Sequence, residues 1–491
     1  MSPFFFVKKA EGDQAEARKS RPSIGVELEF LLCIAEANQP LNVPEMFEMS
    51  KGAPYVLPAD VRRYKVVIEM VRETLGRTIA NAVASHRGDR VVQSKDEASS
   101  DMESLHLKHY SDWTVHVDHT VVLPDHLRAQ PDIRGYRWYP VEIASPVLWA
   151  TDESWEEIHA VVRAIRDTYW LLTPPTAGLH YHYGNGKSYI PFGKLRRIAA
   201  LLFAVDPIMT QLHPEHRRSN KYCLSNRLYS RIAHGRSAAA AARELGAEYV
   251  EEEPEVFGVR RRPDPAARPV RPRTSTLFLP FKRGTLTGYE FDASIFDAPA
   301  YADEVEEAEG RPGNPAPSKI PYAVGEILRC LNAPTVAELM RYKPIPGDRP
   351  AYSFQDYTLD RYKRMIEEDC LINLEYQSKR TIEFRQMAST MEPEEVVAHG
   401  KVIVRLCEFA AESDLEELWR LVFDCATAED HSDWFDVFDL LAELGLDSEA
   451  SVLQHSVARF RSESTPESKA AAKRTGHGSN CLRCLFGLEM L

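Results

Sequence analysis

Four short segments of this 491-residue chain alternate acidic or histidine side chains with apolar ones. They cover residues 25–30, 141–143, 178–184 and 381–385. Alternate side chains of an extended strand project to the same face, so each segment should present its polar side chains on one face and its apolar side chains on the other. A sheet with one buried face and one polar face is typically antiparallel. We therefore expect an antiparallel sheet that carries carboxylates on one face.

The polar positions of these segments suggest a site for divalent metal. They form pairs of side chains that share a face: Glu27 with Glu29, His180 with His182, and Glu383 with Arg385. Carboxylates gathered on one face repel each other unless a cation neutralises them. Glu27 and Glu29 lie roughly 6.5–7 Å apart along a strand, which lets them serve two metal ions about 3.5–4 Å apart, as in phosphoryl chemistry. Oxygen ligands favour Mg²⁺, and an imidazole moves the preference slightly towards Mn²⁺.

Each motif also has a purely structural explanation. A Glu-x-Glu pair on a strand is usually a solvated surface, and a Glu-Phe-Arg sequence is usually a surface ion pair. The His-x-His motif is more specific, because Gly178 and Gly184 on either side of it suggest a close approach of the backbone. The metal hypothesis depends on all four segments having the same alternation. Arg385 cannot ligate metal, but its planar guanidinium could contact phosphate oxygens.

Composition restricts the partners of the chain. A net charge of −13 argues against a nucleic-acid backbone as a partner, which needs clustered Lys and Arg, but it does not exclude a nucleotide that carries magnesium. Eight scattered cysteines do not form a secreted disulfide framework. Lys8 and Lys9 interrupt the only N-terminal apolar run, and no run approaches the roughly 20 apolar residues of a membrane span. We expect a cytoplasmic protein without nucleic-acid or membrane partners.

Hydrophobic periodicity places the main elements. Apolar residues at steps of three and four predict helices over 58–85, from Thr151 or Asp152 to Pro174, and over 193–212 and 392–412, with two or three more to about 461. Alternation predicts strands over 23–33, 113–121, 136–146, 178–184 and 381–385.

Taken in order, segments 24–30, 141–148, 178–182 and 381–386 resemble the amidoligase family of the glutamine synthetase and glutamate–cysteine ligase (carboxylate–amine ligase) superfamily. The strand at 113–118 lies between the first two. The resemblance covers about 23–412. It implies an α+β fold with a curved antiparallel sheet, helices on its convex face and a concave face that binds ATP and metal.

The resemblance also implies domain boundaries. A flexible leader would cover 1–22, and a catalytic domain 23–412 would carry insertions near 235–275 and 302–318, where Glu, Arg, Gly and Pro are frequent. C-terminal helices over 413–461 would pack on that domain, and 462–491 would form a flexible tail. One of the insertions, or the region 302–350, could act as a lid. No function is assigned to the Cys481-x-x-Cys484 motif of the tail.

The family's site residues transfer to matching positions. Glu29 and Glu142 would bind one metal ion, and a second ion between the ATP phosphates would be held by Glu27, His180 and Glu383. Arg385 would steady the γ-phosphoryl group as it transfers, so Arg385 and Glu29 are the catalytic candidates.

Four further residues keep two interpretations each. His182 could contact phosphate or substrate, or it could hydrogen-bond a neighbouring carboxylate. Asp118 could bind the attacking amine, or it could form a turn. Arg217 and Arg218 could bind the nucleotide phosphates, or they could end a solvated helix near its C-terminal dipole.

The leading hypothesis is an ATP- and Mg²⁺-dependent ligase that activates a carboxylate as an acyl phosphate and joins it to an amine. Alternatives are phosphoryl transfer to a nitrogen or carboxylate acceptor without amide formation, a non-catalytic nucleotide- or metal-binding relative, and a metal-dependent hydrolase. Free amino acids, a peptide terminus and a specialised-metabolism intermediate all stay open as substrates, as does the oligomeric state.

Overall fold

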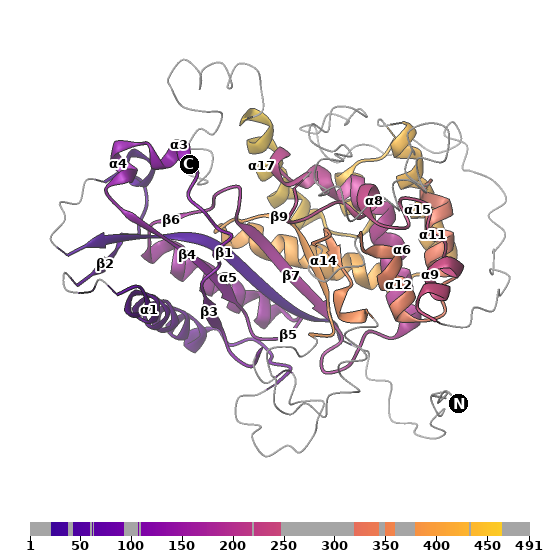
Figure 1. Cartoon of the computed structure of the whole chain (residues 1–491), viewed down its shortest axis with the longest axis horizontal. Coiled ribbons are helices and arrows are strands. Elements are labelled where there is room, and N and C mark those ends of the chain that lie inside the picture. The colour runs from indigo at the N-terminus through magenta and orange to yellow at the C-terminus, as the bar shows by residue number, and fades with distance from the viewer. Residues whose placement is uncertain are drawn as a thin grey trace.

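The computed structural model, shown in Figure 1, describes residues 21–37, 43–58, 61, 63–92, 107, 110–218, 220–246, 319–342, 349–358, 379–431 and 434–463. Most of the expected leader, residues 247–275 and 302–318 of the expected insertions, and the tail with Cys481 and Cys484 lie outside these ranges. The described start of the first insertion contains a short helix, α9 (Ala238–Glu244).

Within the described residues, nine strands form one sheet in the order β3-β4-β1-β7-β9-β8, while β2, β5 and β6 also pair with β1. The strands are β1 (Ser23–Glu36), β2 (Tyr55–Leu57), β3 (Thr114–His116), β4 (Arg137–Ala144), β5 (Leu148–Trp149), β6 (Leu171–Leu172), β7 (Gly178–Gly184), β8 (Tyr352–Ser353) and β9 (Ile382–Ala388). Every pairing is antiparallel except that of β1 with β2. The expected antiparallel sheet is confirmed.

The two faces of β1 bury different cores. Its even-numbered apolar residues, from Ile24 to Ile34, join the main core beneath the helices. On the opposite face Leu31, Cys33 and Ala35 join a smaller core with Phe47 and Trp170. Glu27 and Glu29 lie on this second face, in the half of β1 that the smaller core does not include.

Long amphipathic helices cover the main-core face of the sheet. They are α1 (Tyr64–Ser85), α5 (Asp152–Thr168), α6 (Phe192–Met209) and α14 (Pro393–Glu412). Thr151 caps α5 by accepting from the Ser154 N–H. Three C-terminal helices, α15 (Leu415–Asp430), α16 (Val437–Glu443) and α17 (Asp447–Glu463), pack against α6 and α14. The chain is therefore an α+β protein.

Shorter helices complete the described chain. They are α3 (Asp125–Arg128), α4 (Pro131–Arg134), α7 (Glu215–Arg218), α8 (Asn226–Tyr229), α11 (Ile320–Leu328), α12 (Ala333–Met340) and the 3₁₀ helices η1 (Glu45–Phe47), η3 (Thr210–Leu212) and η7 (Gln355–Tyr357). In Figure 1, α8, α9, α11 and α12 gather with α6 and α15 beside the sheet. No helix of the described residues is both long and apolar enough to span a bilayer.

Three predicted elements differ from the structure. The helix expected to run to Pro174 ends at Thr168, and Leu171–Leu172 form the strand β6. The helix expected over 58–85 begins only at Tyr64. The strand expected over 113–121 ends at His116, because Asp118 accepts hydrogen bonds from the Thr120 N–H and hydroxyl, both at 2.8 Å, and so turns the chain. Asp118 therefore lies in a turn and not on the strand.

A buried ion pair ties α5 to the segment before β3. The Glu157 carboxylate accepts from both terminal nitrogens of Arg90 at 2.6 and 2.7 Å, and from Trp113 Nε1 at 2.6 Å. The two charged side chains are 0% and 3% exposed. Breaking such a pair leaves one buried charge uncompensated, which typically costs about 3–5 kcal/mol.

We expect Glu157→Gln to lower the free energy of unfolding by about 3 kcal/mol, because Arg90 would stay buried without a counter-charge. Urea unfolding followed by circular dichroism measures this change. The matched control is Glu156→Gln, the exposed neighbour on the same helix, which should change the stability little. Equal stabilities of the two variants would contradict the structural importance of the pair.

Candidate active site on the acidic face of the sheet

Strand register brings six side chains of the acidic face together. Glu29 on β1 lies directly opposite Glu142 on β4, and Glu27 lies opposite His180 on β7. Glu383 comes from β9, the next strand beyond β7, and Asp118 from the turn after β3. Residues directly opposite each other in antiparallel strands have side chains on the same face, so segments more than 350 residues apart in sequence meet here.

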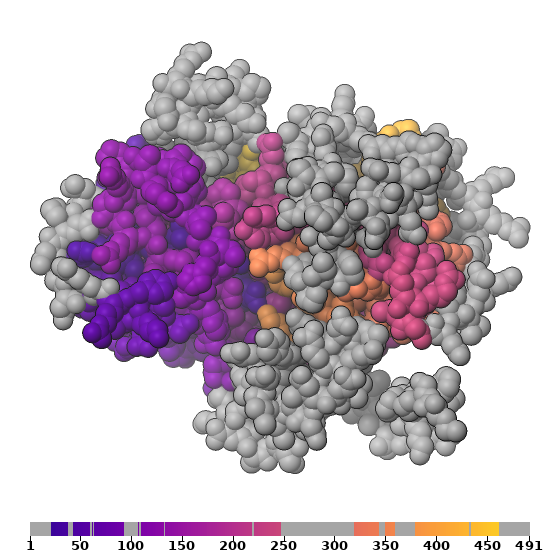
Figure 2. All heavy atoms as spheres, in the orientation of Figure 1, coloured from indigo at the N-terminus to yellow at the C-terminus, as the bar shows by residue number. Residues whose placement is uncertain are grey.

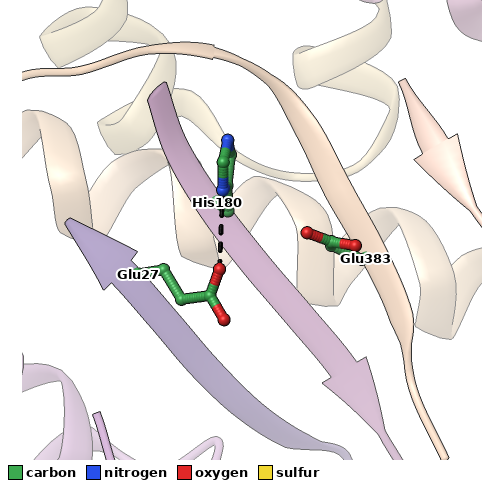
Figure 3. A group of neighbouring side chains, drawn as sticks. All are labelled: Glu27, His180 and Glu383. Carbon is green, nitrogen blue, oxygen red and sulfur yellow. Dashed lines mark ion pairs between the residues drawn. The ribbon is translucent and has the colours of Figure 1, made fainter. Parts of the chain in front are cut away.

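The six side chains form two clusters. In the first, one ligand atom each of Glu27, His180 and Glu383 lies within 4.8 Å of the others. Figure 3 shows them on three adjacent strands, with Glu27 and His180 directed towards each other. In the second, the same limit holds for Glu29, Asp118 and Glu142. This division matches the two ligand sets that the resemblance implies and adds Asp118 to one of them; metal binding itself stays a prediction.

His180 lies between the clusters. Its Nδ1 is 3.5 Å from Glu27 Oε2 and 3.4 Å from Glu29 Oε1, and it is buried without a hydrogen-bond partner among the residues that the structure describes. Gly178 makes room for the ring, because a Cβ at this position would lie 2.4 Å from His180 Nε2. The Gly178 N–H also donates to Glu29 Oε2 at 2.7 Å. The close approach expected from the flanking glycine is therefore present at Gly178.

The two clusters differ in their electrostatics. Burial and the negative charges of Glu27 and Glu29 raise the pKa of Glu142 to about 8. Burial also raises the pKa of Glu29. Burial acts in the same direction on Glu27 and Glu383, but nearby cations outweigh it. Lys379 with His182 holds the pKa of Glu27 well below its usual range, and Arg385 lowers the pKa of Glu383. The first cluster is thus paired with cations, while like charges dominate the second.

His182 contacts Glu27 of the first cluster and so helps to orient it. Its Nε2 lies 2.9 Å from Glu27 Oε1, and its Nδ1 lies 3.0 Å from Thr381 Oγ1. The Thr381 N–H in turn donates to Asp356 at 3.2 Å. Of the two roles left open for His182, these contacts match the hydrogen bond to a neighbouring carboxylate.

Arg385 is held by one contact on its own strand and by one contact outside it. Its guanidinium forms an ion pair with Glu383, and its Nε donates to the Tyr222 carbonyl at 3.1 Å. β9 has a bulge here, because Arg385 and Gln386 together lie opposite the single residue His180. Arg385 shares the acidic face with Glu383, as alternation along β9 predicts, and Gln386 donates to the buried Asp206 at 2.5 Å.

The two arginines of α7 contact backbone carbonyls. Arg217, which is 2% exposed, donates to the carbonyls of Arg385 and Gln386 at 2.5 and 3.3 Å. Arg218 donates to the His213 carbonyl at 3.0 Å. Arg217 therefore fixes the backbone of the β9 bulge, and phosphate binding by either residue stays a prediction.

Lys379 was missed in the sequence although a signal for it exists. Lys379 stands at every second position with Thr381, Glu383 and Arg385 in the sequence, although the extended strand begins only at Ile382. Its Nζ lies 2.7 Å from Glu27 Oε1 and 5.6 Å from the centre of the Tyr110 ring. His116 on β3 was missed too, and it lies directly opposite Glu142 on β4. Burial together with the charge of Arg72 lowers the pKa of His116.

Comparison with known proteins agrees with this geometry. Residues 23–256 match the model of the Amidoligase_2 family, described as "Putative amidoligase enzyme". Neither the curated proteins nor the solved structures gave a match. The matched residues include Glu27, Glu29, Asp118, Glu142 and His180. The match covers just under half of the chain and supports an amidoligase family for residues 23–256.

Proposed function

We propose that this protein is an ATP- and Mg²⁺-dependent ligase that joins a carboxylate to an amine through an acyl phosphate. The observation that carries the proposal is the pair of clusters that share one sheet face, with His180 between them. The match of residues 23–256 to an amidoligase family supports ligase chemistry. The sheet, with helices on one face and carboxylates on the other, supports a fold of the glutamine synthetase and glutamate–cysteine ligase type.

The donor set fits two divalent ions. Glu29, Asp118 and Glu142 offer only oxygen ligands, which suits Mg²⁺, and burial together with the neighbouring carboxylates raises the pKa of Glu142. In the other cluster, the buried Nδ1 of His180 has no hydrogen-bond partner within the described part of the chain and could ligate a metal ion such as Mg²⁺ or Mn²⁺. When bound, the ions would neutralise and orient the phosphates of ATP.

The protein's own groups would position the reactants. The Arg385 guanidinium, already on the acidic face, would move from Glu383 to the γ-phosphoryl oxygens. His182 and Thr381 would keep Glu27 oriented. The substrate carboxylate attacks the γ-phosphorus and ADP leaves; the amine nitrogen then attacks the acyl carbon, phosphate leaves, and the amine loses one proton. Asp118 lies where it could hold either metal or that amine, and Arg217 and Arg218 stay candidates for the phosphates.

The direct test is incubation with ATP, Mg²⁺ and a mixed pool of amino acids and peptides, followed by mass spectrometry. ADP with a new amide is the expected result. ADP without an amide would favour the phosphoryl-transfer alternative. No turnover, or hydrolysis that needs no nucleotide, would contradict the proposal.

We expect Glu27→Gln and Glu383→Gln each to abolish ATP turnover and leave the fold intact, because each removes one carboxylate from the first cluster. ADP release measures the turnover, and circular dichroism checks the fold. The control is Glu36→Gln at the exposed end of the same strand β1, which should keep turnover. Wild-type turnover in either cluster variant would refute the metal assignment.

Binding of Mg²⁺ should release a proton from Glu142. With a pKa of about 8 this carboxyl is mostly protonated at pH 7 in the metal-free protein, and metal must displace that proton. Affinity for Mg²⁺ should therefore rise between pH 6 and 8 and level off above. Calorimetry in buffers of different ionisation enthalpy should show about 0.9 proton released at pH 7 and little at pH 9. Release that persists in Glu142→Gln would assign the proton to another group.

Arg385→Lys keeps the charge but removes the planar fork. If Arg385 steadies the transferring phosphoryl group, kcat should fall about a hundredfold while the KM for ATP changes much less. The control is Arg420→Lys, since Arg420 makes a two-point pair with Glu443 on α15 and α16, away from the site. Near-normal kcat with reduced thermal stability would instead give Arg385 a structural role as the partner of Glu383.

A further inference from the structure

Lys379 occupies one side of the first cluster. Its Nζ contacts Glu27 Oε1 at 2.7 Å and His182 Nε2 at 3.2 Å. Because His182 also contacts Oε1, at 2.9 Å, the other oxygen of Glu27, Oε2, is the one that faces His180. The side chain of Lys379 is still 32% exposed, so a ligand on the acidic face could reach it.

The backbone next to Lys379 is held in an unusual conformation. Arg380 has a φ of 58°, in the left-handed region that non-glycine residues seldom adopt. Its Nη1 donates to the Lys187 carbonyl at 2.6 Å, and its own carbonyl accepts from the Tyr357 hydroxyl at 3.0 Å. Such conformations persist where the surroundings fix them, and they gather at functional sites. The position of Lys379, three residues before β9, is therefore fixed by the surrounding structure.

This position sets two electrostatic effects against each other. A metal ion on Glu27 Oε2 would lie within roughly 7 Å of the Lys379 ammonium, given metal–oxygen distances near 2.1 Å. That separation is shorter than the Debye length of about 8–10 Å, so solvent ions screen it poorly. Lys379 therefore repels a lone divalent cation at this position. A bound polyphosphate reverses the balance, because its oxygens attract the metal and the ammonium together.

We propose that Lys379 is a phosphate-binding residue that makes metal binding at Glu27 depend on a bound nucleoside triphosphate. The inference rests on the proposed function for its metal and nucleotide. Lys suits the task, because its flexible stem can carry a compact charge from Glu27 to a nearby phosphate oxygen. Lys379 then acts as counter-ion of Glu27 in the empty site and as ligand of the nucleotide in the loaded one.

The test is Mn²⁺ binding, measured by electron paramagnetic resonance with and without the non-hydrolysable analogue AMP-PNP. The Mn²⁺ position at Glu27 is the one that Glu27→Gln removes. Lys379→Met, Lys379→Gln and Lys379→Arg are compared with Lys194→Met. Lys194 is a matched control, because it is 34% exposed and forms an ion pair with Glu412, 3.6 Å away on the helical side.

Without nucleotide, Lys379→Met and Lys379→Gln should bind Mn²⁺ at this position about five- to tenfold tighter, the size expected for removing one partly exposed charge. The gain in Mn²⁺ affinity on adding AMP-PNP should fall by at least about fivefold in both variants. Lys379→Arg and Lys194→Met should behave like the wild type. A role as counter-ion of Glu27 alone would also make Mn²⁺ bind tighter, so the smaller gain with AMP-PNP is the readout that assigns phosphate binding to Lys379.

Two results would overturn the inference. If the neutral variants bind Mn²⁺ no tighter and keep the full gain with AMP-PNP, Lys379 does not couple the two ligands, although the proposed function would stand. If Glu27→Gln removes no Mn²⁺ from the wild-type count, the metal assignment fails and the inference fails with it.

Discussion

One strand carries both the core and the site. β1 pairs along its 14 residues with β2, β4, β5, β6 and β7. A slip of one residue in its register would turn Glu27 and Glu29 into the main core and bring its buried apolar residues to the acidic face. The burial of the even-numbered residues under the helices therefore fixes where the carboxylates point. Core packing and the geometry of the candidate site are set by the same constraint.

The repulsion between the carboxylates of the acidic face is reduced in two different ways. Glu27 and Glu383 each have a cationic side chain in contact, Lys379 and Arg385. Glu142 stays protonated over much of the neutral range, because burial and its acidic neighbours raise its pKa to about 8. Both means allow carboxylates to gather on a partly buried surface that would otherwise repel itself. Both also leave groups that a bound cation or a bound phosphate would rearrange.

Alternation in the sequence was enough to predict the strands that carry the site. β1, β4, β7 and β9 lie where the pattern placed them, and the residues of both clusters were candidates. The pattern shows which face a side chain is on, but not where a strand ends. It therefore did not show that Asp118 leaves β3 through its own hydrogen bonds to Thr120.

Other features depend on contacts between distant parts of the chain. The bulge at Arg385 exists only against β7, and the two-residue strands β5, β6 and β8 are too short to have a period. The partnership of Arg90 with Glu157 spans 67 positions, and no local pattern of burial or charge links the two residues.

The site is built from two parts of the chain that the family match separates. Residues 23–256 contain Glu27, Glu29, Glu142 and His180, whereas β9 supplies Glu383 and Arg385 from beyond the matched region. β9 pairs with β7 along Gly178–Tyr183 and buries Ile382 and Phe384 in the main core. Without β9, β7 would be an exposed edge with unpaired backbone groups. The strand that completes the first cluster is thus also the strand that closes the sheet beside it, so the matched region can have neither an intact sheet nor a complete first cluster on its own.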